Sequence, residues 1–195
     1  VGFTQLARIE FEKEGGALNT DAIDNSAGVN VSDYEVNLKI LMNYCLQNNI
    51  IGSITERNKL LELAAEESCA LDLANNRAQH MLISMDQLRS LNGFRLFRNL
   101  ILSYISMGKL DAKTEAIPNQ SKLAQLESDN KPLYRSVLAV LQAYVKMEIS
   151  QELFKSKLIR DKHLNRFYLE YFPEAIKQKL GKFIHKHKLK KEIIS

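Results

Sequence analysis

The sequence has few of the residues that mark disulfide-stapled, turn-rich or membrane-spanning proteins. Its 195 residues include no tryptophan, three prolines, eight glycines and two cysteines. Cys45 and Cys69 provide no disulfide framework, and we expect both to be small buried apolar side chains in a reducing compartment, the cytoplasm. No apolar run approaches the roughly 18 residues that a membrane span requires, so no membrane partner is predicted.

Several short motifs of catalytic and cofactor sites are also missing. The sequence contains no G-x-G-x-x-G fingerprint, no P-loop and no nucleophile elbow. His185 and His187 are two residues apart, which places them on different faces of a helix, and no third ligand lies nearby in the sequence. A metal site is therefore not predicted.

The residues that are present favour helices. Hydrophobic residues make up 45% of the chain, and prolines are few. Capping boxes at Ser32–Glu35 and Ser53–Glu56 predict two helix starts. A short strand is predicted over residues 17–20, and the nearly all-apolar segment 137–149 predicts a buried central helix. Apolar periodicity and breaks predict helices over residues 4–14, 32–49, 53–71, 72–84, 86–107, 121–128, 134–156, 161–172 and from 174 onward.

The most informative segment is residues 15–35, GGALNTDAIDNSAGVNVSDYE, in which small and polar side chains crowd before a helix. Such a turn leaves backbone N–H groups and the positive end of the helix dipole free to hold an anion. Asp21 and Asp24 lie in this segment, and isolated aspartates beside a turn are more often local backbone acceptors than catalytic bases. The segment is predicted to be an anion-binding elbow.

The same segment closely resembles the active-site segment of the large bacterial NAD-dependent glutamate dehydrogenases. Asn25 to Ser32, NSAGVNVS, is also similar to the Asn-Ala-Gly-Gly-Val-Thr-Val-Ser segment of ordinary glutamate dehydrogenases. Weaker likenesses follow at residues 133–144 and at residues 171–173. The chain departs from the large-enzyme pattern at Asn30-Val31, Tyr34 and Ser136-Val137, none of which removes a ligand group that the resemblance assigns.

The resemblance implies an NAD-dependent oxidative deamination of glutamate to 2-oxoglutarate and ammonia, by a protein that is a homo-oligomer at full length. It assigns the amide of Asn25 to the nicotinamide end of NAD. It assigns Val29 to the apolar wall beside the substrate, and the hydroxyl of Ser32 to the substrate carboxylate. The catalytic lysine and aspartate and the dinucleotide fingerprint of the family lie outside this chain. We therefore expect no catalytic residue in it, a fragment of a longer enzyme, and no activity of the fragment alone.

The resemblance and the helical patterning together predict a mainly α fold. Residues 1–50 are expected to form the trailing edge of a Rossmann-like α/β nucleotide-binding domain. Residues 51–195 are expected to form an all-helical C-terminal domain. The composition change around residues 48–54 sets the boundary.

The basic C-terminal segment supports a rival prediction. The net charge is +4, and residues 174–195 alone hold seven lysines and two glutamates, a net +5. This segment would suit a non-enzymatic helical interaction module that binds an acidic partner or RNA. No arginine-rich or aromatic base-reading pattern accompanies the lysines, so a solvated helix face is favoured over nucleic-acid binding.

Overall fold

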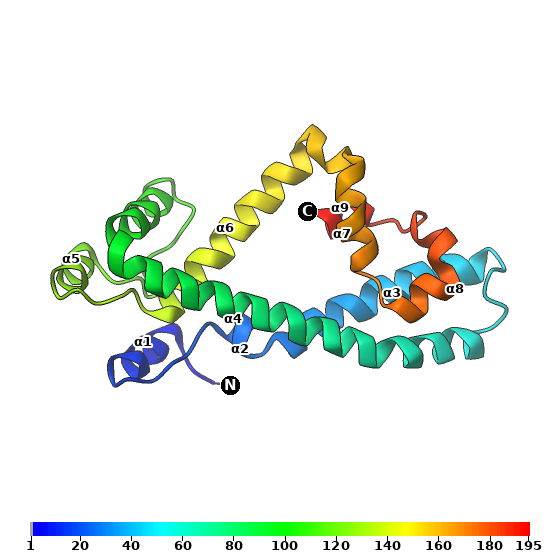
Figure 1. Cartoon of the computed structure of the whole chain (residues 1–195), viewed down its shortest axis with the longest axis horizontal. Coiled ribbons are helices and arrows are strands. Elements are labelled where there is room, and N and C mark those ends of the chain that lie inside the picture. The colour runs from blue at the N-terminus through cyan, green and yellow to red at the C-terminus, as the bar shows by residue number, and fades with distance from the viewer. Residues whose placement is uncertain (1) are drawn as a thin grey trace. The chain divides into compact units, whose positions relative to one another are not determined.

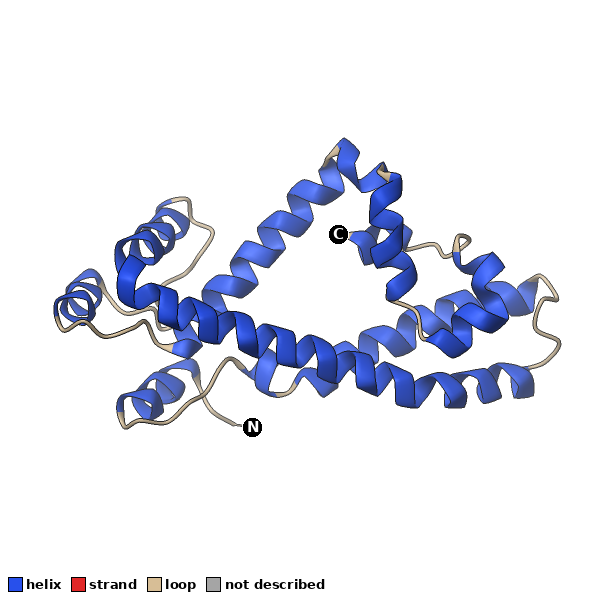
Figure 2. Ribbon diagram, viewed as in Figure 1, coloured by secondary structure: helices blue, strands red, loops and turns tan. Residues whose placement is uncertain are grey.

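A computed structural model describes residues 2–195, and every regular element within them is a helix (Figures 1 and 2). The chain forms two compact units. The first contains residues up to Asn25 together with Asn76–Met147, and the second contains Ser26–Asn75 together with Glu148–Ser195. The mainly helical prediction is confirmed.

The first unit begins with helix α1, Gln5–Lys13, and the short helix α2, Asp21–Asp24. It continues with the later part of α4, Ile54–Ser106, then α5, Gln120–Ser128, and most of α6, Arg135–Lys155. The predicted start and end of α1 are confirmed. Thr4 Oγ1 accepts from the Ala7 N–H at 3.2 Å, and Gly15 follows the helix with φ +90°.

The core of the first unit joins α1, α2, α5 and α6 to the second half of α4. Its buried members are Ile9, Ile23, Ile83, Phe94, Ile101, Tyr104, Leu110, Ile117, Leu123, Leu126, Leu133 and residues 137–141. The prediction that 137–149 is buried throughout is wrong for its second half, because Met147 and Ile149 are 50% and 60% exposed.

Helix α4 replaces three predicted helices. It runs for 53 residues and is interrupted only at Gly93, whose φ and ψ of −127° and 30° are not helical. The predicted breaks near residues 71 and 85 are wrong, because no glycine or proline lies there to stop the hydrogen-bond ladder. The predicted start is confirmed, since Ser53 Oγ accepts from the Glu56 N–H at 3.1 Å.

The second unit contains the single turn Ser26–Gly28, helix α3, Asn30–Gln47, and the first part of α4. After α6 follow the 3-10 turns Lys157–Arg160 and Lys162–Leu164, α7, Asn165–Glu170, α8, Glu174–Ile184, and α9, Lys190–Ile194. Its core consists of Leu38, Leu41, Met42, Cys45, Ile51, Leu60, Ala64, Tyr168, Phe172, Ile176, Leu180 and Ile184.

Five further predictions need correction or stay open. Residues 17–20 form a loop, because residues 2–195 contain no strand with which they pair. The helix predicted over 161–172 is shorter, because two 3-10 turns precede α7. Cys45 is buried as predicted, whereas the prediction for Cys69 is wrong, because this residue of α4 is exposed. The Rossmann-like edge and the boundary between domains 1–50 and 51–195 stay predictions.

Candidate functional site

The small-residue segment lies on a loop, two single turns and a helix start. Residues up to Asn25 belong to the first unit, and residues from Ser26 belong to the second. Asn25 ends α2, and its backbone N–H bonds to Asp21 O at 2.8 Å. Each half of the segment is bound to its own unit through polar side chains.

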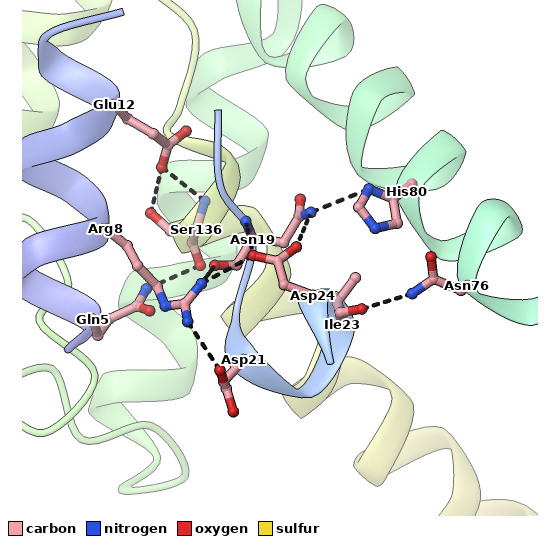
Figure 3. A network of polar contacts seen from close by, with 10 residues as sticks. All are labelled: Gln5, Arg8, Glu12, Asn19, Asp21, Ile23, Asp24, Asn76, His80 and Ser136. Atoms are coloured by element: carbon pink, nitrogen blue, oxygen red, sulfur yellow. Dashed lines mark hydrogen bonds and ion pairs between the residues drawn. The ribbon is translucent and has the colours of Figure 1, made fainter. Parts of the chain in front are cut away.

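In the first unit a buried arginine holds the loop in place. Arg8, on α1, is 2% exposed. Its guanidinium donates to Asn19 O at 2.7 Å, to Asp24 Oδ2 at 3.0 Å and to Asp21 Oδ1 at 3.3 Å (Figure 3). Asp24 also accepts from the backbone N–H and the side-chain amide of Asn19, at 3.0 and 2.8 Å. The prediction that Asp24 is a local backbone acceptor is therefore confirmed, and the carboxylate pairs with a charge as well.

Helix α4 contributes two further contacts to this half. Asn76 Nδ2 donates to Ile23 O at 2.6 Å, and Asn19 Nδ2 lies 3.2 Å from His80 Nδ1 (Figure 3). An amide NH₂ only donates, so His80 Nδ1 is the acceptor in this contact. The loop between α1 and α2 is thereby bound from both sides.

In the second unit a buried aspartate of α4 binds the other half. Asp72 is 3% exposed and accepts from Ser26 Oγ at 3.3 Å and from Asn30 Nδ2 at 2.8 Å. One turn further along α4, Asn75 Nδ2 donates to the hydroxyl of Tyr34 at 3.1 Å. The side chains of Ser26 and Asn30 thus position the start of α3.

Tyrosines extend this contact to Tyr171, the residue that follows α7. The rings of Tyr34 and Tyr171 stack with centroids 4.7 Å apart. The Tyr171 hydroxyl donates to Asp33 Oδ2 at 2.7 Å and accepts from Asn37 Nδ2 at 2.9 Å. Burial raises the pKa of both phenols, and the bond to the Asp33 carboxylate raises the pKa of Tyr171 further. Both tyrosines are therefore neutral hydrogen-bonding groups at physiological pH.

Comparison with known proteins places these residues in a family. Residues 1–86 match the model of the bacterial NAD-glutamate dehydrogenase catalytic domain, and residues 130–195 match that of the glutamate dehydrogenase C-terminal region. The whole chain is 40% identical to the NAD-specific glutamate dehydrogenase of Pseudomonas aeruginosa. It is 31% and 32% identical to those of Mycobacterium tuberculosis and Halomonas elongata. The chain spans 12% of the length of each of these relatives.

The chain belongs to the bacterial NAD-glutamate dehydrogenase family.

The three residues that the family resemblance assigns to ligands are exposed. Val29 is 63% exposed, and Asn25 and Ser32 are exposed as well. Neither the Asn25 amide nor the Ser32 hydroxyl makes a side-chain hydrogen bond to any of residues 2–195. Their polar groups are therefore available to other molecules, whereas those of Asn19 and Asp24 are used within the chain.

The predicted N-cap role of Ser32 in this glutamate dehydrogenase segment is wrong. Helix α3 begins at Asn30, and its N-cap residue is Val29, which has no side-chain acceptor. Ser32 therefore lies within the first turn. The helix starts earlier because the Asn30 side chain is held by Asp72 and the Asp33 N–H reaches Val29 O at 3.0 Å.

Sequence reasoning missed the residues that hold the family segment in place. These residues are Arg8, Asp72 and His80. The last two lie more than 40 residues after the groups that they bind. For Arg8 the sequence did hold a signal: it is next to Ile9, and both residues are buried in α1. No local pattern marked Asp72 or His80.

The remaining candidate residues have structural contacts. His187 is 4% exposed. Its Nε2 donates to Asn37 O at 2.9 Å, and its Nδ1 accepts from the Leu189 N–H at 3.1 Å. Lys177 pairs with Glu174 at 2.9 Å. Across residues 2–195, no group of three or more His, Cys, Asp or Glu side chains is arranged to hold a metal ion, and no helix has the length and apolarity to cross a bilayer.

Proposed function

We propose that this chain is part of an NAD-dependent glutamate dehydrogenase, which converts glutamate to 2-oxoglutarate and ammonia in the cytoplasm. NAD supplies the hydride acceptor when it is bound. The observation that carries the proposal is that residues 19–32 contain two kinds of side chain, those that hydrogen-bond within the chain and those that are exposed. Four polar side chains hydrogen-bond to other side chains of this chain: Asn19, Asp24, Ser26 and Asn30. The residues assigned to ligands remain exposed.

The roles of the exposed residues follow from their chemistry. The Asn25 amide has both donors and an acceptor for the carboxamide of nicotinamide, and it makes no competing bond. Ser32 lies in the first turn of α3, where backbone N–H groups and the helix dipole favour a carboxylate. Its hydroxyl would donate to that carboxylate, and Val29 would contact the methylene groups of the substrate.

The proposal places the rest of the catalytic machinery outside this chain. The catalytic lysine and aspartate and the dinucleotide fingerprint belong to other parts of a full-length homo-oligomer. Residues 1–50 then form the edge of a nucleotide-binding domain, and residues 51–195 a helical C-terminal domain. The isolated 195-residue chain should produce no NADH from glutamate and NAD, and measurable production would contradict this assignment.

Replacement of Ser32 tests the substrate assignment in the complete natural protein that carries this chain. Ser32→Ala removes a charge-assisted hydrogen bond, so kcat/KM for glutamate should fall roughly ten- to a hundredfold, with little change in the KM for NAD. Ser121→Ala is the matched control, since Ser121 is an exposed serine in the first turn of α5. Unchanged glutamate kinetics in folded Ser32→Ala protein would remove Ser32 from the substrate site.

The basic C-terminal segment still supports a second candidate, an interaction module for an acidic partner or RNA. The apolar stripe of α8 is buried, and its lysines lie on the other faces. A complete natural protein that forms no NADH from glutamate yet binds RNA through these lysines would favour this candidate.

A further inference from the structure

The first unit contains a pocket of about 490 Å³ beside the Arg8 network. None of Asn25, Val29 and Ser32 lines it. One wall is a stripe of α4, formed by His80, Ser84 and Gln87 at helical spacing. The lining residues are Arg8, Ala17, Leu18, Asn19, Asp24, His80, Ser84, Gln87 and Arg135.

One of the two guanidinium groups in this pocket has no carboxylate partner. Arg8 pairs with Asp21 and Asp24. Arg135 Nη1 instead donates to Ser84 Oγ at 2.8 Å, and Nη2 to His80 O at 3.5 Å, and no acidic side chain within residues 2–195 forms an ion pair with it. Of the donors of Arg135, Glu12 accepts from the backbone N–H, at 2.6 Å, and not from the guanidinium. A guanidinium has five N–H donors, so Arg135 keeps both its charge and several donors for a ligand.

A buried acceptor also lines the pocket. Asn19 is 3% exposed. Its Nδ2 donates to Asp24 Oδ1 at 2.8 Å and lies 3.2 Å from His80 Nδ1, which fixes the orientation of the amide (Figure 3). Asn19 Oδ1 has no hydrogen-bond partner among residues 2–195. A buried carbonyl oxygen without a donor is costly, so the site calls for a ligand that supplies a hydrogen.

We propose that this pocket binds a hydrogenphosphate group, either free phosphate or the phosphate of a monoester. Its negative oxygens would accept from the Arg135 guanidinium, and its P–OH would donate to Asn19 Oδ1. A cation would be repelled by Arg135. Sulfate has a similar shape and charge but no hydrogen to donate at neutral pH, so it would leave Asn19 Oδ1 unpaired.

Titration calorimetry on the complete natural protein tests the proposal with inorganic phosphate and with sulfate at matched ionic strength. Phosphate should bind at least tenfold more tightly than sulfate, and this comparison needs no variant. Equal affinities for the two anions, or no phosphate binding, would overturn the proposal. Glycerol 3-phosphate distinguishes the sources, because tighter binding than phosphate identifies a monoester and equal or weaker binding identifies free phosphate.

Two charge-matched variants localise the binding. Arg135→Gln should weaken phosphate binding at least tenfold. Arg98→Gln removes an equal charge from the same unit but outside the pocket, where Arg98 pairs with Glu127, and should leave phosphate affinity unchanged. Equal effects of the two substitutions would show that the phosphate binds elsewhere. Should Arg135→Gln not fold, Arg135→Lys keeps the charge while losing the planar fork, and it should weaken binding for that reason.

Discussion

Arg8 should contribute more to stability than any exposed ion pair of the chain. Its guanidinium is buried and makes three bonds, to Asn19 O, Asp24 and Asp21. Arg8→Met keeps the apolar stem but removes the N–H donors that Arg8 supplies to the Asn19 carbonyl and to the Asp24 carboxylate. Breaking a buried pair costs roughly 3–5 kcal/mol. Asp24 keeps two donors from Asn19 and its side chain is 21% exposed, so we expect about 3 kcal/mol, the lower end of that range.

Urea unfolding followed by circular dichroism at 222 nm measures this loss. Arg89→Met is the matched control, because Arg89 pairs with Asp86 on the surface with 59% of its side chain exposed, and it should cost less than about 1 kcal/mol. In addition, Asp24→Asn should cost about 1–3 kcal/mol less in the Arg8→Met background than in the unmodified chain, because the two groups interact directly. Equal losses for Arg8→Met and Arg89→Met would refute the reasoning.

Three further predictions concern other parts of the fold. Glu12 accepts from the first N–H groups of α6, so Glu12→Ala should lower the free energy of unfolding by about 1–2 kcal/mol in the same urea assay, and an unchanged midpoint would contradict this role. Burial lowers the pKa of His187 below its usual 6.5. As the pH falls, the imidazole of the unfolded chain is therefore protonated before that of the folded chain. Stability should therefore be constant above about pH 6.5 and fall below it, and His187→Gln should flatten the profile. A thiol reagent should modify the exposed Cys69 quickly. Cys45 is buried, and burial raises the pKa of its thiol, so it should react only on unfolding. Rapid modification of both thiols in the folded protein would be evidence against the fold.

Local sequence patterns determined the mainly helical class and the family. Local signals predicted the helix start at residue 4, the capping box at Ser53 and the helix from residue 174 onward. Each could be read from the sequence because it depends on residues within one or two turns. The family segment was readable for the same reason, since its identity lies in a continuous run of residues from Asn19 to Ser32.

Only the tertiary structure decided which polar residues of that run are supports and which are exposed. Asn19, Asp24 and Ser26 look no different from Asn25 and Ser32 in the sequence. Their partners lie on α1 and α4, up to 61 residues away for the Asn19–His80 contact. The same long-range contacts moved the start of α3 ahead of Ser32 and joined the buried acceptor of Asn19 to the charge of Arg135 in one pocket. Hydrogen bonding across such distances depends on how helices pack, and no local periodicity records that packing.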